Sequence, residues 1–130
     1  MQEILFKTPI RGVSGYATYA RELIKAFYNK YKDDYKIQVW NYPWQEYDIP
    51  LKDSSEENLI SYLSGVRVNK DNSILINWTL PHEFLPDCKY NIGYSLFETD
   101  RIPDYWRISC NKMDEMWLPS TFNKGTFLDS

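Results

Sequence analysis

Residues 3–27, "EILFKTPIRGVSGYATYARELIKAF", contain a change of hydrophobic period that decides the fold class. Ile4, Leu5 and Phe6 form a short continuous apolar run, which is typical of a strand buried on both faces. From Tyr16 onward the apolar residues recur at helical spacing, so a helix is expected through Tyr31. Its buried stripe is predicted to be Tyr16, Tyr19, Ala20, Leu23, Ile24, Phe27 and Tyr31. The residues predicted to point away from the stripe are Arg21, Glu22, Lys25 and Asn29.

The same alternation of strand and helix continues along the chain. Further strands are expected at residues 36–42, 73–78, 91–97 and 116–118. One helix is expected to be capped by Ser54 or Ser55 and to run through Leu63. Pro103 starts another helix, and Ser120 caps a last one. The helix after Pro103 is predicted to bury Trp106, Cys110 and Met113. The pattern predicts an α/β fold with a Rossmann-like parallel sheet and helices on both faces.

Length and composition restrict the function classes. A chain of 130 residues has room for one domain with a single core. A net charge of −3 argues against nucleic-acid binding, which usually depends on clustered Lys and Arg. No apolar stretch approaches the roughly 20 residues that span a bilayer. Two cysteines, Cys88 and Cys110, are too few for a disulfide framework, and they do not have the spacing of metal ligands. They are therefore interpreted as reduced thiols in a cytoplasmic protein.

Ligands of open parallel sheets bind beyond the carboxyl ends of the strands, and the first such segment contains two glycines. Gly12 and Gly15 stand between the first strand and its helix, where free N–H groups of the first turn can hold a phosphate. The spacing fits neither Walker A nor G-x-G-x-x-G. From the residues alone, a plain tight turn and a phosphate-binding turn both remain open.

Two later segments carry polar side chains after strands. His82, the single histidine, follows the third strand and suits a proton carrier or a hydrogen-bond donor, although a surface histidine would look the same. Residues 98–101 (Glu98, Thr99, Asp100 and Arg101) have the chemistry to bind sugar hydroxyls, or to cap the next helix. No second His or Cys stands at ligand spacing from His82, so a metal site is not expected.

Aromatic residues make up 17% of the chain and include five Trp. Trp40, Trp78, Trp106 and Trp117 fall in or beside predicted strands and helices, so core packing is expected for them. Trp44 and Tyr47 follow the second strand in a loop, where they are candidates for stacking on an acceptor.

Two segments resemble a known family. "GVSGYATYARELIKAF" (residues 12–27) and "GYSLFETDRIPDYWRISCNKMDEMWLPSTFNKGTF" (residues 93–127) closely resemble family-4-type glycosyltransferases of the GT-B fold. The resemblance implies transfer of a sugar from a nucleotide-sugar to a glycan, lipid or other acceptor, with retention and without a metal or other cofactor. It implies a catalytic histidine at His82 that hydrogen-bonds the transferred sugar. It places the donor diphosphate at Gly12, Val13, Ser14, Gly15 and Tyr16. It places the acceptor at Glu98, Thr99, Asp100 and Arg101, and Trp44 joins that group from its loop position.

Enzymes of this family have a second Rossmann-like domain, which holds most of the nucleotide-sugar through an E-x7-E motif. Residues 1–130 therefore correspond to part of the N-terminal, acceptor-side domain, and the donor-binding domain is the partner that the resemblance implies. Residues 1–130 alone are expected to be inactive. A cytoplasmic location is expected, and contact with the inner face of a membrane is compatible with it. The alternative is a non-catalytic binding or interaction module derived from such an enzyme.

Overall fold

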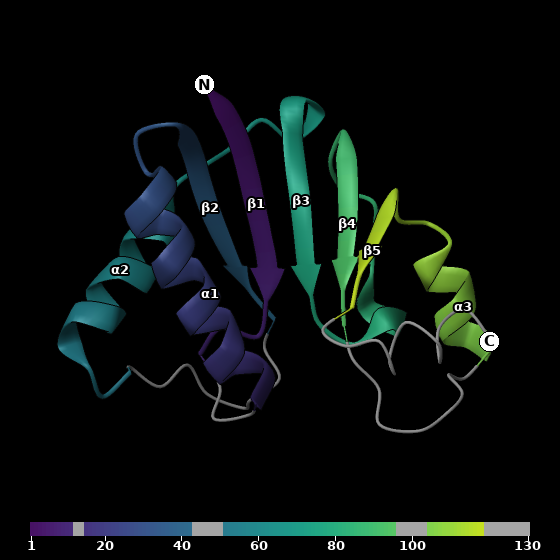
Figure 1. The fold of residues 1–130 in the computed structure, drawn as a ribbon, viewed down its shortest axis with the longest axis horizontal. Coiled ribbons are helices and arrows are strands. Elements are labelled where there is room, and N and C mark those ends of the chain that lie inside the picture. Colours follow the sequence, from purple (N-terminus) through teal and green to yellow (C-terminus); the bar gives the residue numbers. More distant parts are fainter. Residues whose placement is uncertain (12–14, 43–50, 96–103, 119–130) are drawn as a thin grey trace.

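Five strands lie side by side in one sheet, and their arrows all point the same way (Figure 1). The computed structural model describes residues 1–11, 15–42, 51–95 and 104–118. The strands are β1 (Gln2–Thr8), β2 (Tyr35–Asn41), β3 (Ser73–Trp78), β4 (Tyr90–Tyr94) and β5 (Glu115–Trp117). Their order is β2-β1-β3-β4-β5, and each pairing is parallel. The predicted α/β fold with a Rossmann-like parallel sheet is confirmed.

Three α-helices and two short 3-10 helices connect these strands. They are α1 (Gly15–Tyr31), α2 (Ser54–Gly65), η1 (Lys70–Asn72), η2 (Pro81–Glu83) and α3 (Asp104–Cys110). The predicted helix 16–31 and the predicted strand 73–78 agree with α1 and β3. The strand predicted at 91–97 is described only as far as Ser95, and the helix expected after Ser120 lies outside the described residues.

Both α1 and α2 pack on the same face of the sheet. The register places Ile4 opposite Ile37 and Phe6 opposite Val39, so these side chains project from one face. The core cluster there consists of Ile4, Phe6, Ile10, Ala20, Ile24, Ile37, Val39, Ile60, Leu63, Ile76, Trp78, Ile92 and Tyr94. Full burial of a side chain such as Phe6 contributes roughly 1.5–3 kcal/mol.

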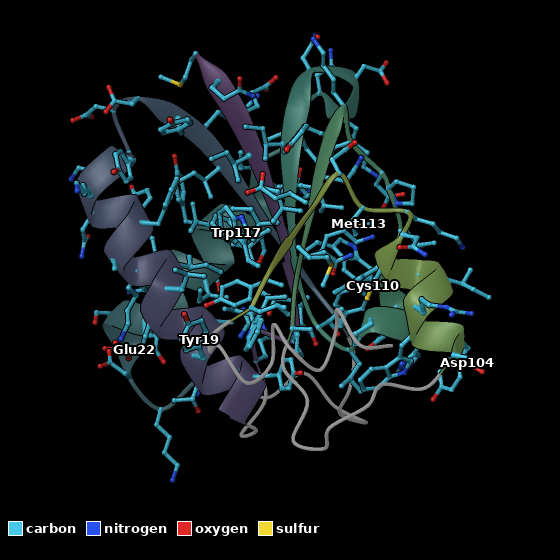
Figure 2. The ribbon with its side chains drawn as sticks, turned by 45° about the vertical axis from the view of Figure 1, so that its right-hand side comes forward. Tyr19, Glu22, Asp104, Cys110, Met113 and Trp117 are labelled. Atoms are coloured by element: carbon cyan, nitrogen blue, oxygen red, sulfur yellow. The ribbon has the colours of Figure 1, made fainter. Side chains whose placement is uncertain are left out.

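The other face is covered by η2 and α3, which pack against each other. Gly93 lies on this face of the sheet. A Cβ atom added to it would lie 2.7 Å from the Phe84 side chain and 3.0 Å from the Met113 side chain. In Figure 2, Cys110 lies on the sheet-facing side of α3, and Met113 follows in the turn that leads to β5. Helices on both faces were predicted, and the structure agrees.

The predicted buried stripe of α1 is correct at its centre and wrong at one position. Ile24 is buried, and Leu23 and Phe27 are half-buried against the core. Tyr19 is 43% exposed because it stands near the carboxyl ends of the strands, beyond the apolar centre of the face. Arg21 and Lys25, which were predicted to point away from the stripe, both form ion pairs with Glu56 of α2, at 3.1 and 2.8 Å.

The amino-terminal cap of α2 is Asp53 rather than Ser54 or Ser55. Its carboxylate accepts hydrogen bonds from the amides of Ser55 and Glu56 at 2.9 and 3.1 Å. The hydroxyl of Ser55 also donates to Asp53, and this bond and the amide bonds lower the pKa of the Asp53 carboxyl. A carboxylate interacts with the positive end of the helix more strongly than a hydroxyl does, which explains the one-residue shift.

Of the three residues predicted to form the buried stripe after Pro103, two are buried. Trp106 and Met113 are buried, whereas Cys110 is half-buried. Both cysteines are free thiols. Burial raises the pKa of Cys110 to about 11, so its thiol stays protonated at neutral pH. Within the described ranges, no helix is long and apolar enough to cross a membrane.

Candidate functional site

The carboxyl ends of the five strands meet at one edge of the sheet, which we call the carboxyl edge (lower edge in Figure 1). Thr8, Asn41, Trp78, Tyr94 and Trp117 are the last residues of the five strands. This edge is where open parallel sheets bind ligands. The segments predicted to be functional all follow strands at this edge.

The first turn of α1 is open to a ligand at Gly15. This residue is exposed, and a Cβ added to it would meet no heavy atom within 4 Å. No described glycine has a positive φ, so the backbone at Gly15 does not need glycine. The first turn carries no acidic side chain, which leaves its amide groups favourable to an anion. Gly12, Val13 and Ser14 lie outside the described residues.

Trp78 fixes the position of this first turn. Its indole Nε1 donates to the main-chain oxygen of Tyr16 at 2.7 Å. The rings of Tyr16 and Trp78 also stack, with centroids 4.4 Å apart and an interplanar angle of 26°. The end of β3 and the start of α1 are therefore held together by a hydrogen bond and a stacked pair.

Two tyrosine hydroxyls of α1 reach the end of β4. Tyr16 Oη lies 3.0 Å from Ser95 Oγ, and the hydroxyls of Tyr19 and Tyr94 form a short hydrogen bond. Burial raises the pKa of Tyr94, and the hydrogen bond with Tyr19 raises it further, so the Tyr94 hydroxyl stays protonated at neutral pH. Ser95 directly precedes the segment that contains Glu98 to Arg101. The contact between Tyr16 and Ser95 thus joins the helix after the predicted diphosphate turn to the strand before the predicted acceptor segment.

These residues form an edge aromatic cluster of Tyr16, Tyr19, Trp78, Tyr94 and Trp117. Trp78 is 2% exposed and Trp117 is 37% exposed, so the cluster runs from the core to the surface. The rings of Tyr94 and Trp117 lie 5.9 Å apart. Sequence reasoning missed this cluster. Aromatic residues at the ends of three successive strands, with two more in the first turns of α1, were the signal for it.

His82 lies at the same edge, on the face covered by α3. It is exposed on η2, and its ring lies 6.2 Å from Trp106 and 6.1 Å from Tyr105. A hydrogen bond holds η2 in place, because the hydroxyl of Thr79 donates to the carboxylate of Glu83 at 2.8 Å. The structure leaves the imidazole accessible and does not bring it into contact with the edge aromatic cluster in the described residues.

Buried polar groups lie behind this edge. Tyr42 donates to Asn77 Oδ1 at 3.2 Å, and burial raises the pKa of Tyr42 to about 12. Thr8 Oγ1 and Asn77 Nδ2 are buried and have no hydrogen-bond partner among the described residues. The ends of β1 and β3 therefore hold unused hydrogen-bonding capacity.

The four tryptophans in the described residues divide evenly between the core and the surface. Trp78 and Trp106 are buried as predicted. Trp40 and Trp117 are 43% and 37% exposed, so core packing was the wrong expectation for them. Both stand on the two outermost strands of the sheet, where fewer side chains cover them. Lys7 lies 5.0 Å from the Trp40 ring and pairs with Asp87 at 2.6 Å.

The predicted acceptor residues belong to the segments 43–50 and 96–103. Trp44, Tyr47, Glu98, Thr99, Asp100 and Arg101 lie outside the described residues. In the part of the chain that the structure does describe, no group of three or more His, Cys, Asp or Glu could hold a metal ion. Comparison of the chain with family models, with curated proteins and with solved structures gave no match.

Proposed function

We propose that this chain is the acceptor-side domain of a retaining glycosyltransferase that transfers a sugar from a nucleotide-sugar to an acceptor. The proposal combines the sequence resemblance with the arrangement at the carboxyl edge. The single observation that carries it is the pair of contacts from Tyr16: to Trp78 at the end of β3 and to Ser95 after β4. These contacts support one shared site built from segments that are far apart in the sequence.

In this proposal the first turn of α1 receives the donor diphosphate. Gly15 has neither a backbone conformation nor a described neighbour that requires glycine, so close approach of a ligand is the remaining physical reason for it. The amides of the turn would bind the leaving diphosphate, and Tyr16 would line the site. Stabilising charge on the leaving group is a large part of the rate in such transfers.

His82 would hydrogen-bond the transferred sugar from the other side of the edge, and its exposure leaves room for a substrate. Glu98 to Arg101 and Trp44 would bind the acceptor through their carboxylates, guanidinium group and ring. The donor-binding domain would close the cleft. Orientation of the two substrates between the domains would supply much of the rate acceleration.

The test is nucleotide-sugar turnover by the complete natural protein, followed as release of nucleoside diphosphate with a panel of donors and acceptors. Gly15→Val should reduce turnover at least about tenfold, or roughly 1.4 kcal/mol of transition-state stabilisation, because its side chain blocks the diphosphate. Gly65→Val is the matched control, since Gly65 is equally open and lies at the far end of α2. It should leave turnover unchanged.

The outcomes separate the proposal from its alternatives. If Gly15→Val loses both stability and turnover while Gly65→Val loses neither, a plain turn that requires glycine is favoured. Equal turnover in Gly15→Val and the parent would remove the turn from the mechanism. Binding of a nucleoside diphosphate without release from any nucleotide-sugar would favour the non-catalytic module.

A further inference from the structure

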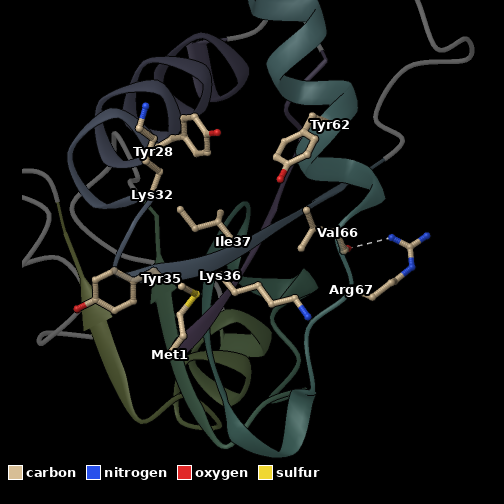
Figure 3. A pocket seen from close by; sticks show the side chains of 9 residues that line it. All are labelled: Met1, Tyr28, Lys32, Tyr35, Lys36, Ile37, Tyr62, Val66 and Arg67. Atoms are coloured by element: carbon tan, nitrogen blue, oxygen red, sulfur yellow. Dashed lines mark hydrogen bonds between the residues drawn. The ribbon is translucent and has the colours of Figure 1, made fainter.

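A pocket of about 400 Å³ lies at the opposite edge of the sheet from the carboxyl edge (Figure 3). It is bounded by the last turns of α1, by the start of β2 and by the end of α2. Ile37 is its buried apolar floor. The volume is within the range of small-molecule sites. None of the residues of the carboxyl edge contributes to it.

The pocket is cationic in an acidic chain. Lys32, Lys36 and Arg67 line it, and no carboxylate does, although the whole chain has a net charge of −3. Lys36 lies 3.5 Å from Glu3, a long and exposed ion pair. Lys32 and Arg67 have no carboxylate within 4.0 Å among the described residues, although Asp33 and Asp34 follow Lys32 in the exposed turn. Two cations are therefore available to an anion.

The negative ends of the two helices do not cancel this charge. The carbonyl oxygens of Tyr28 and Tyr31 accept hydrogen bonds from the amides of Lys32 and Asp34, each at 2.9 Å. At the end of α2, Arg67 donates to the main-chain oxygens of Ser64 and Val66 at 2.8 and 3.0 Å. Four carbonyl groups near these helix ends are thus already hydrogen-bonded, which weakens their repulsion of an anion.

Three tyrosines supply ring faces and hydroxyls. Tyr28 and Tyr62 project their hydroxyls into the space between α1 and α2, above Ile37 (Figure 3). Tyr35 adds its ring at the start of β2. The hydroxyls of Tyr28 and Tyr62 form no hydrogen bond with the described residues, so each is free to donate to or accept from a ligand hydroxyl.

We propose that this pocket binds an anionic monosaccharide, that is, a single sugar ring that carries a phosphate or a carboxylate. The tyrosine rings pack on the face of the sugar, and their hydroxyls bond its hydroxyl groups. Lys32, Lys36 and Arg67 bind the anion. The pocket volume of about 400 Å³ is enough for one sugar ring with one anionic group.

The experiment is an NMR titration of the 130-residue chain with glucose 1-phosphate, glucuronate, glucose and inorganic phosphate. Glucose 1-phosphate or glucuronate should shift the amide signals of Tyr28, Ile37 and Tyr62 saturably, and affinity should fall as salt rises. Comparison of the two ligands decides whether phosphate or carboxylate is preferred. Glucose or phosphate alone should bind at least about tenfold more weakly, because each lacks half of the contacts.

Variants then assign the contacts. Lys36→Gln should weaken binding about threefold to fivefold, as for an exposed charge pair, and the double change Lys32→Gln with Lys36→Gln at least about tenfold. Tyr62→Ala should weaken it by a similar factor. Lys30→Gln, on α1 outside the pocket, and Tyr90→Ala, an exposed tyrosine on β4, should leave binding unchanged.

Three results would overturn the proposal. The first is equal affinity for glucose, which would remove the role of charge. The second is equal affinity for inorganic phosphate, which would remove the role of the rings. The third is the absence of saturable binding, or shifts confined to Tyr16 and Ser95 at the carboxyl edge. Shifts confined to Tyr16 and Ser95 would instead support binding at the carboxyl edge. None of the three results counts against the proposed transferase, whose test depends on Gly15.

Discussion

Trp78 and Tyr16 are joined by both ring stacking and a hydrogen bond, although 62 positions separate them. The indole N–H reaches the main-chain oxygen of Tyr16, so the tryptophan positions the backbone of the first turn of α1 as well as its side chain. Much of the geometry of the candidate site depends on this one pair. The first prediction tests it.

Trp78→Phe should lower the free energy of unfolding by about 1–3 kcal/mol. An aromatic ring remains in this variant, but the main-chain oxygen of Tyr16 loses the hydrogen bond from the indole N–H. Trp78→Ala should cost about 3–5 kcal/mol, since it also leaves a cavity. Chemical denaturation measures both. Trp40→Phe is the control at an exposed ring and should cost less than about 1 kcal/mol. Equal losses for Trp78→Phe and Trp40→Phe would contradict the role given to the hydrogen bond.

Gly93→Ala should destabilise the fold by about 1–3 kcal/mol through overpacking. The added Cβ would lie 2.7 Å from both Phe84 and Met116, and the Phe84 ring is fully buried. Gly65→Ala places the same methyl group in open space at the end of α2 and should be neutral or stabilise by up to about 1 kcal/mol. Thermal unfolding compares the two. Adding Phe84→Leu to Gly93→Ala should recover part of the loss, and full additivity of the two costs would argue against the contact.

Glu56→Gln should cost about 1–3 kcal/mol, because Glu56 holds Arg21 and Lys25 of α1 against α2 where it is only 15% exposed. Glu22→Gln removes another partner of Lys25, at 2.9 Å, but Glu22 is 69% exposed. That change should cost less than about 0.5 kcal/mol. The measurement is urea denaturation at low and high salt. A larger loss from Glu22→Gln would show that the connection between the helices does not depend on Glu56.

Tyr42 makes stability fall at alkaline pH. Burial raises its pKa from 10.0 to about 12 in the folded protein, so its contribution is complete below pH 10 and is lost as the pH rises toward 12. A shift of this size corresponds to about 3 kcal/mol. Tyr42→Phe should be less stable than the parent at pH 7, by about 1 kcal/mol, because Asn77 loses its donor.

The difference between Tyr42→Phe and the parent should shrink or reverse between pH 10 and 12, since phenylalanine has no proton to lose. Unfolding by urea along a pH series measures this difference. Tyr62→Phe, at an exposed hydroxyl, is the control and should follow the parent at all pH values. A constant gap between Tyr42→Phe and the parent would contradict the role assigned to burial.

The sheet could be predicted from the sequence because each strand has a local signal. Ile4 to Phe6 are continuously apolar and the run at residues 73–78 is mostly apolar, a pattern that is typical of strands whose two faces are both covered. The exposure of Trp40 could not be predicted in this way, since it depends on how far η2 and α3 extend across the sheet. The cap at Asp53 was within reach of local rules, which rank aspartate at least as high as serine.

The candidate site was predictable only as a set of segments. Gly15, His82 and the residues after β4 were found because each follows a strand. The contacts of Tyr16 with Trp78 and of Tyr19 with Tyr94 span 62 and 75 positions, and no local period encodes them. They depend on the order of strands in the sheet, which places β3 and β4 next to α1.

The place of β1 inside the sheet, between β2 and β3, has a consequence for how the protein is made. Of the five strands, β1 is synthesised first, yet one of its two neighbours is β3, and Gln2 donates to the main-chain oxygen of Asn72, 70 residues away. Until residues 73–78 have been synthesised, β1 has only β2 as a neighbour in the sheet. Contacts of such long sequence separation slow folding and expose the nascent strand to wrong partners. A newly made chain therefore keeps one side of β1 unpaired in the sheet until the third strand arrives.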